Sequence, residues 1–163
     1  STLLGPVVDM KTVQRCNALI DDALNKGARL LCGGKAESTQ MRATLLDGVT
    51  REMRIWHEES FGPVKSVIRV NGEEEALAVA NESEYGLAAA VYSRDTARAW
   101  NVAQNLQTGI CHINGPTVHD EAQMPFGGCK SSGYGRFGGR AGIAEFTELR
   151  WITMQTRPRE LPF

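Results

Sequence analysis

The segment Glu58-Glu59-Ser60-Phe61-Gly62-Pro63-Val64 places two carboxylates before an aromatic ring and a Gly-Pro turn. A carboxylate that a rigid turn holds in place can accept two hydrogen bonds from a vicinal diol. The ring of Phe61, two residues after Glu59, could then pack beside a flat cofactor. The alternative is a solvated turn with Phe61 in the core, and the residues alone leave both interpretations open.

Histidines and cysteines supply the other candidates for acid–base or nucleophilic chemistry. None of the histidines has a thiol or hydroxyl at a spacing typical of a catalytic pair. No two cysteines form a C-x-x-C pair, and no Cys/His spacing fits a zinc site. We therefore expect reduced thiols, as in a cytoplasmic protein, and no metal site. The residues concerned are His57, His112 and His119, and Cys16, Cys32, Cys111 and Cys129.

Two glycine-rich patterns are similar to phosphate-binding loops but lack the context of such loops. Gly133-Tyr134-Gly135-Arg136-Phe137-Gly138 fits G-x-G-x-x-G, yet no strand is predicted before it. Gly128-Cys129-Lys130-Ser131 lacks the glycine that a P-loop places directly before its lysine. An unrelated α/β nucleotide-binding protein is therefore disfavoured.

The elements that must position these residues alternate between helix and strand. Apolar residues at helical spacing predict a helix between Asp9 and Gly27, and further helices over 73–81, 96–106 and 139–146. Runs rich in β-forming residues predict strands over 29–32, 43–46, 64–70, 88–92, 109–114 and 151–154. This alternation predicts the α/β class, as a three-layer αβα sandwich with a largely parallel sheet.

The composition is that of one ordinary globular domain, with 163 residues of which 42% are hydrophobic. The 18 basic and 19 acidic residues give a formal net charge of −1, and this balance argues against a nucleic-acid partner. No apolar run approaches the roughly 20 residues that a membrane helix needs, so we expect no membrane partner either.

Four segments carry further motifs, in a fixed order along the chain. They are Glu59-Ser60-Phe61-Gly62-Pro63, residues 85–92, residues 108–114 and Pro125-Phe126-Gly127-Gly128-Cys129-Lys130-Ser131-Ser132-Gly133-Tyr134-Gly135-Arg136. Together they resemble the aldehyde dehydrogenase superfamily over essentially the whole chain. The loop over residues 113–125 is similar to the aromatic-aldehyde branch, which includes salicylaldehyde, vanillin and benzaldehyde dehydrogenases.

The resemblance implies NAD(P)⁺-dependent oxidation of an aldehyde, here an aromatic one such as salicylaldehyde, to the carboxylic acid. In the family a cysteine thiolate attacks the aldehyde, the thiohemiacetal passes a hydride to nicotinamide, and a glutamate base activates water. NAD or NADP is therefore the expected cofactor. By the matching, Glu59 holds the nicotinamide ribose hydroxyls and Phe61 packs near the nicotinamide.

The same matching implies substrate contacts in the second half of the chain. Phe126 is expected to line the aldehyde pocket, and Thr117, Val118 and His119 are expected to lie at its mouth. No catalytic residue is expected in this chain, because the family's nucleophilic cysteine, general-base glutamate and main NAD-binding domain lie upstream of the matching segment.

The chain is therefore expected to be the C-terminal third of such an enzyme and inactive alone. Residues 1–147 are expected to form the C-terminal portion of the catalytic domain, and residues 148–163 an oligomerisation tail. In the family, the strand matching Leu149 to Gln155 adds to a neighbouring subunit's sheet. The expected partners are the aldehyde and further copies of the chain, in a dimer or tetramer.

The alternative is a non-catalytic oligomerisation or binding module derived from an aldehyde dehydrogenase. The two hypotheses differ only in whether an upstream chain exists. The chain begins with Ser1-Thr2-Leu3-Leu4, which is typical of the middle of a loop, and no initiator methionine is present. This favours a piece of a longer protein.

Overall fold

The computed structural model describes residues 4–160 and 162. The chain divides into two compact units, Ser1–Ala76 and Leu77–Phe163, and the division falls inside helix α3 (Glu73–Glu82). Both units contain helices and strands. The α/β class expected from the sequence is therefore confirmed.

The first unit is organised around α1 (Met10–Asn25), the helix predicted between Asp9 and Gly27. The Asp9 carboxylate caps it by accepting hydrogen bonds from the main-chain N–H of Thr12 at 2.8 Å and from its hydroxyl at 2.9 Å. Gly27 follows the helix with a φ of 99°, which glycine adopts without a steric penalty. One face of α1 is buried, through Val13, Cys16, Leu19, Ile20 and Ala23.

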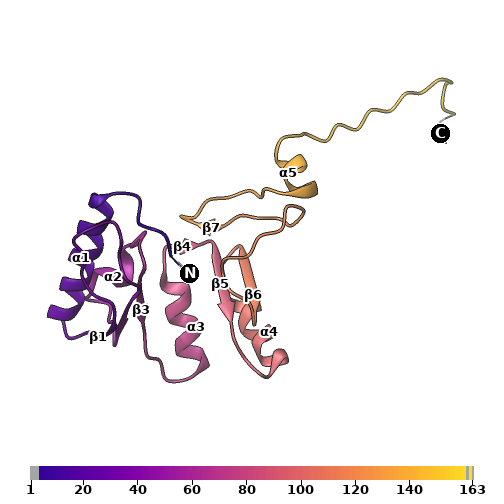
Figure 1. Cartoon of the computed structure of the whole chain (residues 1–163). Helices are drawn as coiled ribbons and strands as arrows, with labels where there is room; N and C mark the ends of the chain where they lie inside the picture. Colours follow the sequence, from indigo (N-terminus) through magenta and orange to yellow (C-terminus); the bar gives the residue numbers. More distant parts are fainter. Residues whose placement is uncertain (1–3, 161, 163) are drawn as a thin grey trace. The chain divides into compact units, whose positions relative to one another are not determined.

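That face packs against a three-stranded mixed sheet (Figure 1). β1 (Arg29–Cys32) pairs with β2 (Thr44–Asp47) in antiparallel fashion, and β2 pairs with β3 (Val64–Val67) in parallel. The short helix α2 (Arg54–His57), which the sequence does not predict, lies in the connection between β2 and β3. It adds Ile55 to the core.

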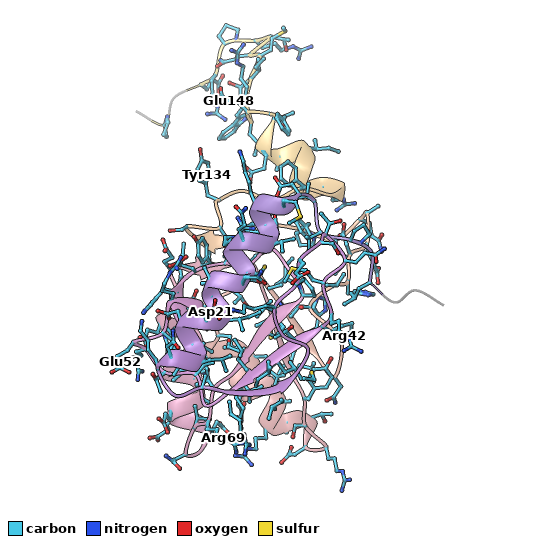
Figure 2. The ribbon with its side chains drawn as sticks, turned by 60° about the vertical axis from the view of Figure 1, so that its left-hand side comes forward. Asp21, Arg42, Glu52, Arg69, Tyr134 and Glu148 are labelled. Carbon is cyan, nitrogen blue, oxygen red and sulfur yellow. The ribbon has the colours of Figure 1, made fainter. Side chains whose placement is uncertain are left out.

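A buried carboxylate at the end of β2 is neutralised by two arginines. Arg69 donates to Asp47 from Nε at 3.0 Å and from Nη2 at 2.7 Å, and Arg29 donates from Nη2 at 2.8 Å. Figure 2 shows the Arg69 side chain at the surface of the molecule. The two hydrogen bonds from Arg69, together with the one from Arg29, outweigh burial and hold the pKa of Asp47 below its ordinary value.

The second unit is built on one β-α-β element. β5 (Ala88–Val91) and β6 (Ile110–Ile113) pair in parallel, and α4 (Thr96–Asn105) connects them beside the two strands (Figure 1). Asp95 caps α4 by accepting a hydrogen bond from the main-chain N–H of Arg98 at 3.0 Å. All three elements agree with the sequence prediction to within two residues at each end.

The remaining elements of this unit bring the glycine-rich segment back to the strands. β4 (Tyr85–Gly86) and β7 (Cys129–Lys130) form a short antiparallel pair that the sequence does not predict. Helix α5 (Gly139–Glu145) lies where a short helix is predicted. Within the described chain the strands form three small sheets, of which β2–β3 and β5–β6 are the parallel pairs.

The C-terminal segment, residues 148–160, extends beyond α5 without helix or strand (Figures 1 and 2). The strand predicted over Trp151–Met154 is therefore wrong for this chain by itself. A strand needs a neighbouring strand to bond its N–H and C=O groups, and none of the described strands pairs with this segment. Its apolar side chains Leu149, Trp151, Ile152 and Met154 are each at least 75% exposed.

Candidate functional site

The turn predicted to bind a cofactor lies in the first unit, directly before β3. Glu59 is exposed there. Phe61 has a φ of 48° and exposes 74% of its surface, so the ring does not belong to the core. A left-handed conformation is costly for a bulky side chain, and such strain persists only where the surroundings enforce it. The contacts of this turn must therefore hold Phe61 in place.

Ser60 and Arg15 supply those contacts. The Ser60 hydroxyl lies 3.1 Å from the carbonyl oxygen of Gly62 and 3.3 Å from that of Val64, so it can donate to either. Arg15, from α1, donates from Nε to the Ser60 carbonyl oxygen at 3.0 Å, and its guanidinium carbon lies 5.6 Å from the centre of the Phe61 ring. That separation is within the range of a cation–π interaction. One arginine thus holds both the main chain and the ring of the turn.

Arg15 is a site residue that the sequence does not reveal. In an amphipathic helix it is one polar side chain among several, and its partner lies 45 residues further along the chain. The turn also borders a surface hollow, which gives a flat ligand room beside the ring. Its lining includes Pro6, Val8, Leu45 and Phe61.

The second group of expected site residues is carried by the glycine-rich segment after β6. Phe126 is half-buried, and its main chain exchanges two hydrogen bonds with Phe137, at 3.0 and 2.7 Å. The segment lies very close to the start of β6. A Cβ added at Gly109 would overlap the carbonyl oxygen of Gly127 and would lie 2.9 Å from the Cα of Gly128. The absence of a side chain at Gly109 therefore allows the segment that carries Phe126 to approach β6 closely.

Lys130, the lysine of the P-loop-like pattern, has a structural role. Its ammonium donates to the carbonyl oxygens of Asn81 at 2.7 Å and of Ser83 at 2.9 Å, at the end of α3. A cation at this end of a helix is favoured by the unpaired carbonyl groups there. Tyr134, four residues after Lys130, is 99% exposed and projects outward in Figure 2.

The residues expected at the aldehyde pocket are only partly brought together. His119 and Phe126 line one hollow, together with residues of β6. Thr117 and Val118 are exposed and lie outside its described lining, and Val118 is 91% exposed. The Nε2 of His119 lies 3.4 Å from a carboxylate oxygen of Glu121. The sequence of this loop does not show which of its side chains face the hollow.

His112, on β6, also lines this hollow, although the sequence did not place it among the residues expected at the aldehyde pocket. Its Nε2 is buried and has no hydrogen-bond partner among the described residues. The rings of His112 and His119 meet edge to face, with centroids 5.4 Å apart. The position of His112 in a strand did not indicate that it would line a hollow, because a loop that returns to β6 completes that hollow.

The thiols are not arranged as activated nucleophiles. Burial raises the pKa of Cys16 and of Cys111, which favours the unreactive thiol form. Cys129 donates to the carbonyl oxygen of Gln107 at 3.1 Å.

Across residues 4–160 and 162, no three His, Cys, Asp or Glu side chains gather as metal ligands do. No helix in that part of the chain is long and apolar enough to span a bilayer.

Comparison with known proteins relates this chain to one enzyme family. A vanillin dehydrogenase from Pseudomonas fluorescens is 60% identical over 161 residues, which cover 99% of this chain and 33% of that protein. The crystal structure of a salicylaldehyde dehydrogenase from Pseudomonas putida G7 complexed with salicylaldehyde is 50% identical, with a TM-score of 0.90, over 98% of this chain and 33% of that one. A Mycobacterium tuberculosis aldehyde dehydrogenase complexed with NAD⁺ is 37% identical, with a TM-score of 0.82, over 89% and 31% of the two chains.

The chain therefore spans about a third of the length of the curated relatives that it matches. Residues 1–152 match the family model described as "Aldehyde dehydrogenase family". The resemblance carried by the four motif segments is thus confirmed. The chain belongs to the aldehyde dehydrogenase family.

Proposed function

We propose that this chain is the C-terminal part of an NAD(P)⁺-dependent aldehyde dehydrogenase that oxidises an aromatic aldehyde to its carboxylic acid. The observation that carries the proposal is the 60% identity to a vanillin dehydrogenase over 99% of the chain. The relative solved with salicylaldehyde supports the same substrate class. The cysteine that forms the thiohemiacetal and the glutamate that activates water belong, in this proposal, to sequence outside the chain.

Glu59 and Phe61 are the proposed cofactor-binding residues. A carboxylate suits the two hydroxyls of a ribose, because it can accept a hydrogen bond from each. The exposed ring of Phe61, held by Arg15, suits contact with a flat nicotinamide. NAD(P)⁺, when bound, supplies the hydride acceptor. The role of the turn is to fix the position of that acceptor.

Phe126 and His119 are proposed to line the aldehyde pocket, with Thr117 and Val118 at its mouth. Residues 1–147 are proposed to belong to the catalytic domain, and residues 148–163 to form an oligomerisation segment. The exposed apolar side chains of that segment support this, since a strand edge of another copy would bury them. The free thiols of the chain accord with a cytoplasmic location.

A chimera tests the proposed function. The chain replaces the last third of the P. fluorescens vanillin dehydrogenase, and NADH formation from vanillin and NAD⁺ is measured. We expect turnover by the chimera and none by the 163-residue chain alone. A folded, assembled chimera without turnover would contradict the proposal and would favour the alternative, a non-catalytic module derived from the family.

Neighbouring carboxylates provide a matched pair of variants in that chimera. Glu59→Gln should raise the KM for NAD⁺ by about tenfold to a hundredfold, because a charged hydrogen bond contributes about 1.5–3 kcal/mol. Glu58→Gln is the control, since Arg54 already holds the Glu58 carboxylate at 2.7 and 2.9 Å. Equal effects of the two substitutions would refute the role of Glu59.

A further inference from the structure

The hollow beside β6 contains a polar atom that nothing in the fold satisfies. Its volume is about 330 Å³, and its lining includes Ile110, His112, His119, Met124 and Phe126. The Nε2 of His112 is buried without a hydrogen-bond partner among the described residues. A buried polar atom left without a partner is unfavourable, so each such atom needs an explanation.

Two other polar side chains of the hollow, His119 and Glu121, contact each other and not this atom. The Nε2 of His119 is directed to Glu121, at 3.4 Å, and the two histidine rings meet edge to face. Glu121 in turn accepts a hydrogen bond from Gln123 at 2.5 Å. His119, Glu121 and Gln123 are therefore paired with one another, and the Nε2 of His112 is left without a partner among the described residues.

The shape and chemistry of the lining select one class of guest. A volume of this size lies at the lower end of the range for small-molecule sites, roughly 300–1,000 Å³. Ile110, Met124 and Phe126 offer apolar and aromatic surface, which suits a single aromatic ring. A neutral imidazole nitrogen either donates or accepts one hydrogen bond, and a phenolic hydroxyl can do both.

We propose that His112 determines specificity by hydrogen bonding, through Nε2, to a ring hydroxyl of a hydroxylated aromatic aldehyde held in this hollow. The proposal rests on the proposed function, because it names the substrate class of the same pocket. In this proposal, His112 on β6 recognises the ring hydroxyl. Phe126 and the loop that carries His119 enclose the ring itself.

Matched ligands test the proposal on the 163-residue chain. The probes are benzyl alcohol and 2-, 3- and 4-hydroxybenzyl alcohol, which differ by one hydroxyl and form no imine with lysines. Affinities are measured by NMR titration, with the imidazole nitrogens of the ¹⁵N-labelled chain as reporters. At least one hydroxylated probe should bind about tenfold more tightly than benzyl alcohol and should shift the His112 Nε2 resonance.

His112→Phe keeps an aromatic ring and removes the nitrogen. It should bring the hydroxylated probes to within about twofold of benzyl alcohol, whereas His112→Gln should restore part of the difference. His57→Phe is the control, because the Nε2 of His57 lies 3.0 Å from the carbonyl oxygen of Arg51 in the first unit. Dispersed amide spectra of each variant establish that it is folded.

Three outcomes separate this inference from the proposed function. Loss of the hydroxyl preference in His112→Phe supports it. Binding of all probes without a hydroxyl preference, or a preference unchanged in folded His112→Phe, overturns it and leaves the proposed aromatic substrate standing. Failure of every probe to bind the wild-type chain overturns the inference alone, because turnover by the chimera tests the proposed function separately.

Discussion

Replacing Gly109 by alanine tests how the segment that carries Phe126 is positioned. A Cβ at this residue would overlap the carbonyl oxygen of Gly127 and would lie 2.8 Å from its carbonyl carbon. Both atoms belong to the main chain, so no side-chain rotation can relieve the overlap. Either the glycine-rich segment moves away from β6, or the backbone of the substituted protein is strained.

The expected cost lies at the upper end of the usual range for overpacking. Extra methylenes in a packed interior cost about 1–3 kcal/mol, and the low values come from sites where side chains give way. Here the obstructing atoms are those of Gly127 and Gly128, both buried. We therefore expect Gly109→Ala to lower the free energy of unfolding of the second unit by about 3 kcal/mol.

Gly142→Ala is the matched control within the same unit. Gly142 lies in α5, and its Cβ would meet nothing nearer than the main chain of Phe137 at 3.9 Å. Alanine at a helical position is favoured over glycine by about 0.5–1 kcal/mol, so the control should be neutral or stabilising. Urea titrations with hydrogen exchange at the amides of β6 measure both variants. Equal stability of Gly109→Ala and wild type would refute the reasoning.

Four further outcomes are expected. Asp47→Asn should lower the free energy of unfolding at pH 7, and its difference from wild type should shrink below about pH 4. Folding depresses the pKa of Asp47, so the carboxylate contributes stability above its unfolded pKa and loses it as the pH falls through the folded pKa. Urea midpoints at the two pH values measure this. Arg15→Met should lower the stability of the first unit by about 1 kcal/mol and broaden the range of Phe61 ring orientations, which NMR of the ring protons detects. Leu19→Ala, at a fully buried position, should cost about 3–5 kcal/mol in a urea titration. Removing residues 148–163 should reduce the mass measured by light scattering from that of an oligomer to that of a monomer, and a wild-type chain that is already monomeric would contradict the proposed role of this segment.

Elements whose ends are set by neighbouring residues could be predicted from the sequence. The helix between Asp9 and Gly27 is one, because the cap and the stop both act within a few residues. The strand predicted over 64–70 instead ends at Val67, where its partner β2 also ends at Asp47. A strand lasts only as long as its neighbour, and the length of that neighbour is not a local property.

Side chains that act on distant segments could not be predicted. Helix α2 has four residues, and its first N–H donates to the Asp22 carboxylate, which lies 32 residues earlier in the chain. Arg15 reaches Ser60 in the same way. His112 acquires its proposed role only because the loop that carries His119 returns to β6. Sequence patterns describe the face on which such residues lie, but they do not identify the partner that gives the face its function.

Strain distinguishes the proposed cofactor turn from the other special backbone positions. Among the described residues, three that are not glycine have positive φ: Phe61 at 48°, Asn114 at 57° and Lys130 at 54°. Asn114 is held by its own side chain, which exchanges hydrogen bonds with the main chain of Ser93 at 2.9 and 3.0 Å, and Lys130 is held by its ammonium. The Phe61 side chain forms no hydrogen bond and is largely exposed, so its conformation is enforced from outside, by Arg15. A strained residue whose side chain does not stabilise its own conformation, and whose ring is open to solvent, accords with the proposal that the ring contacts a ligand.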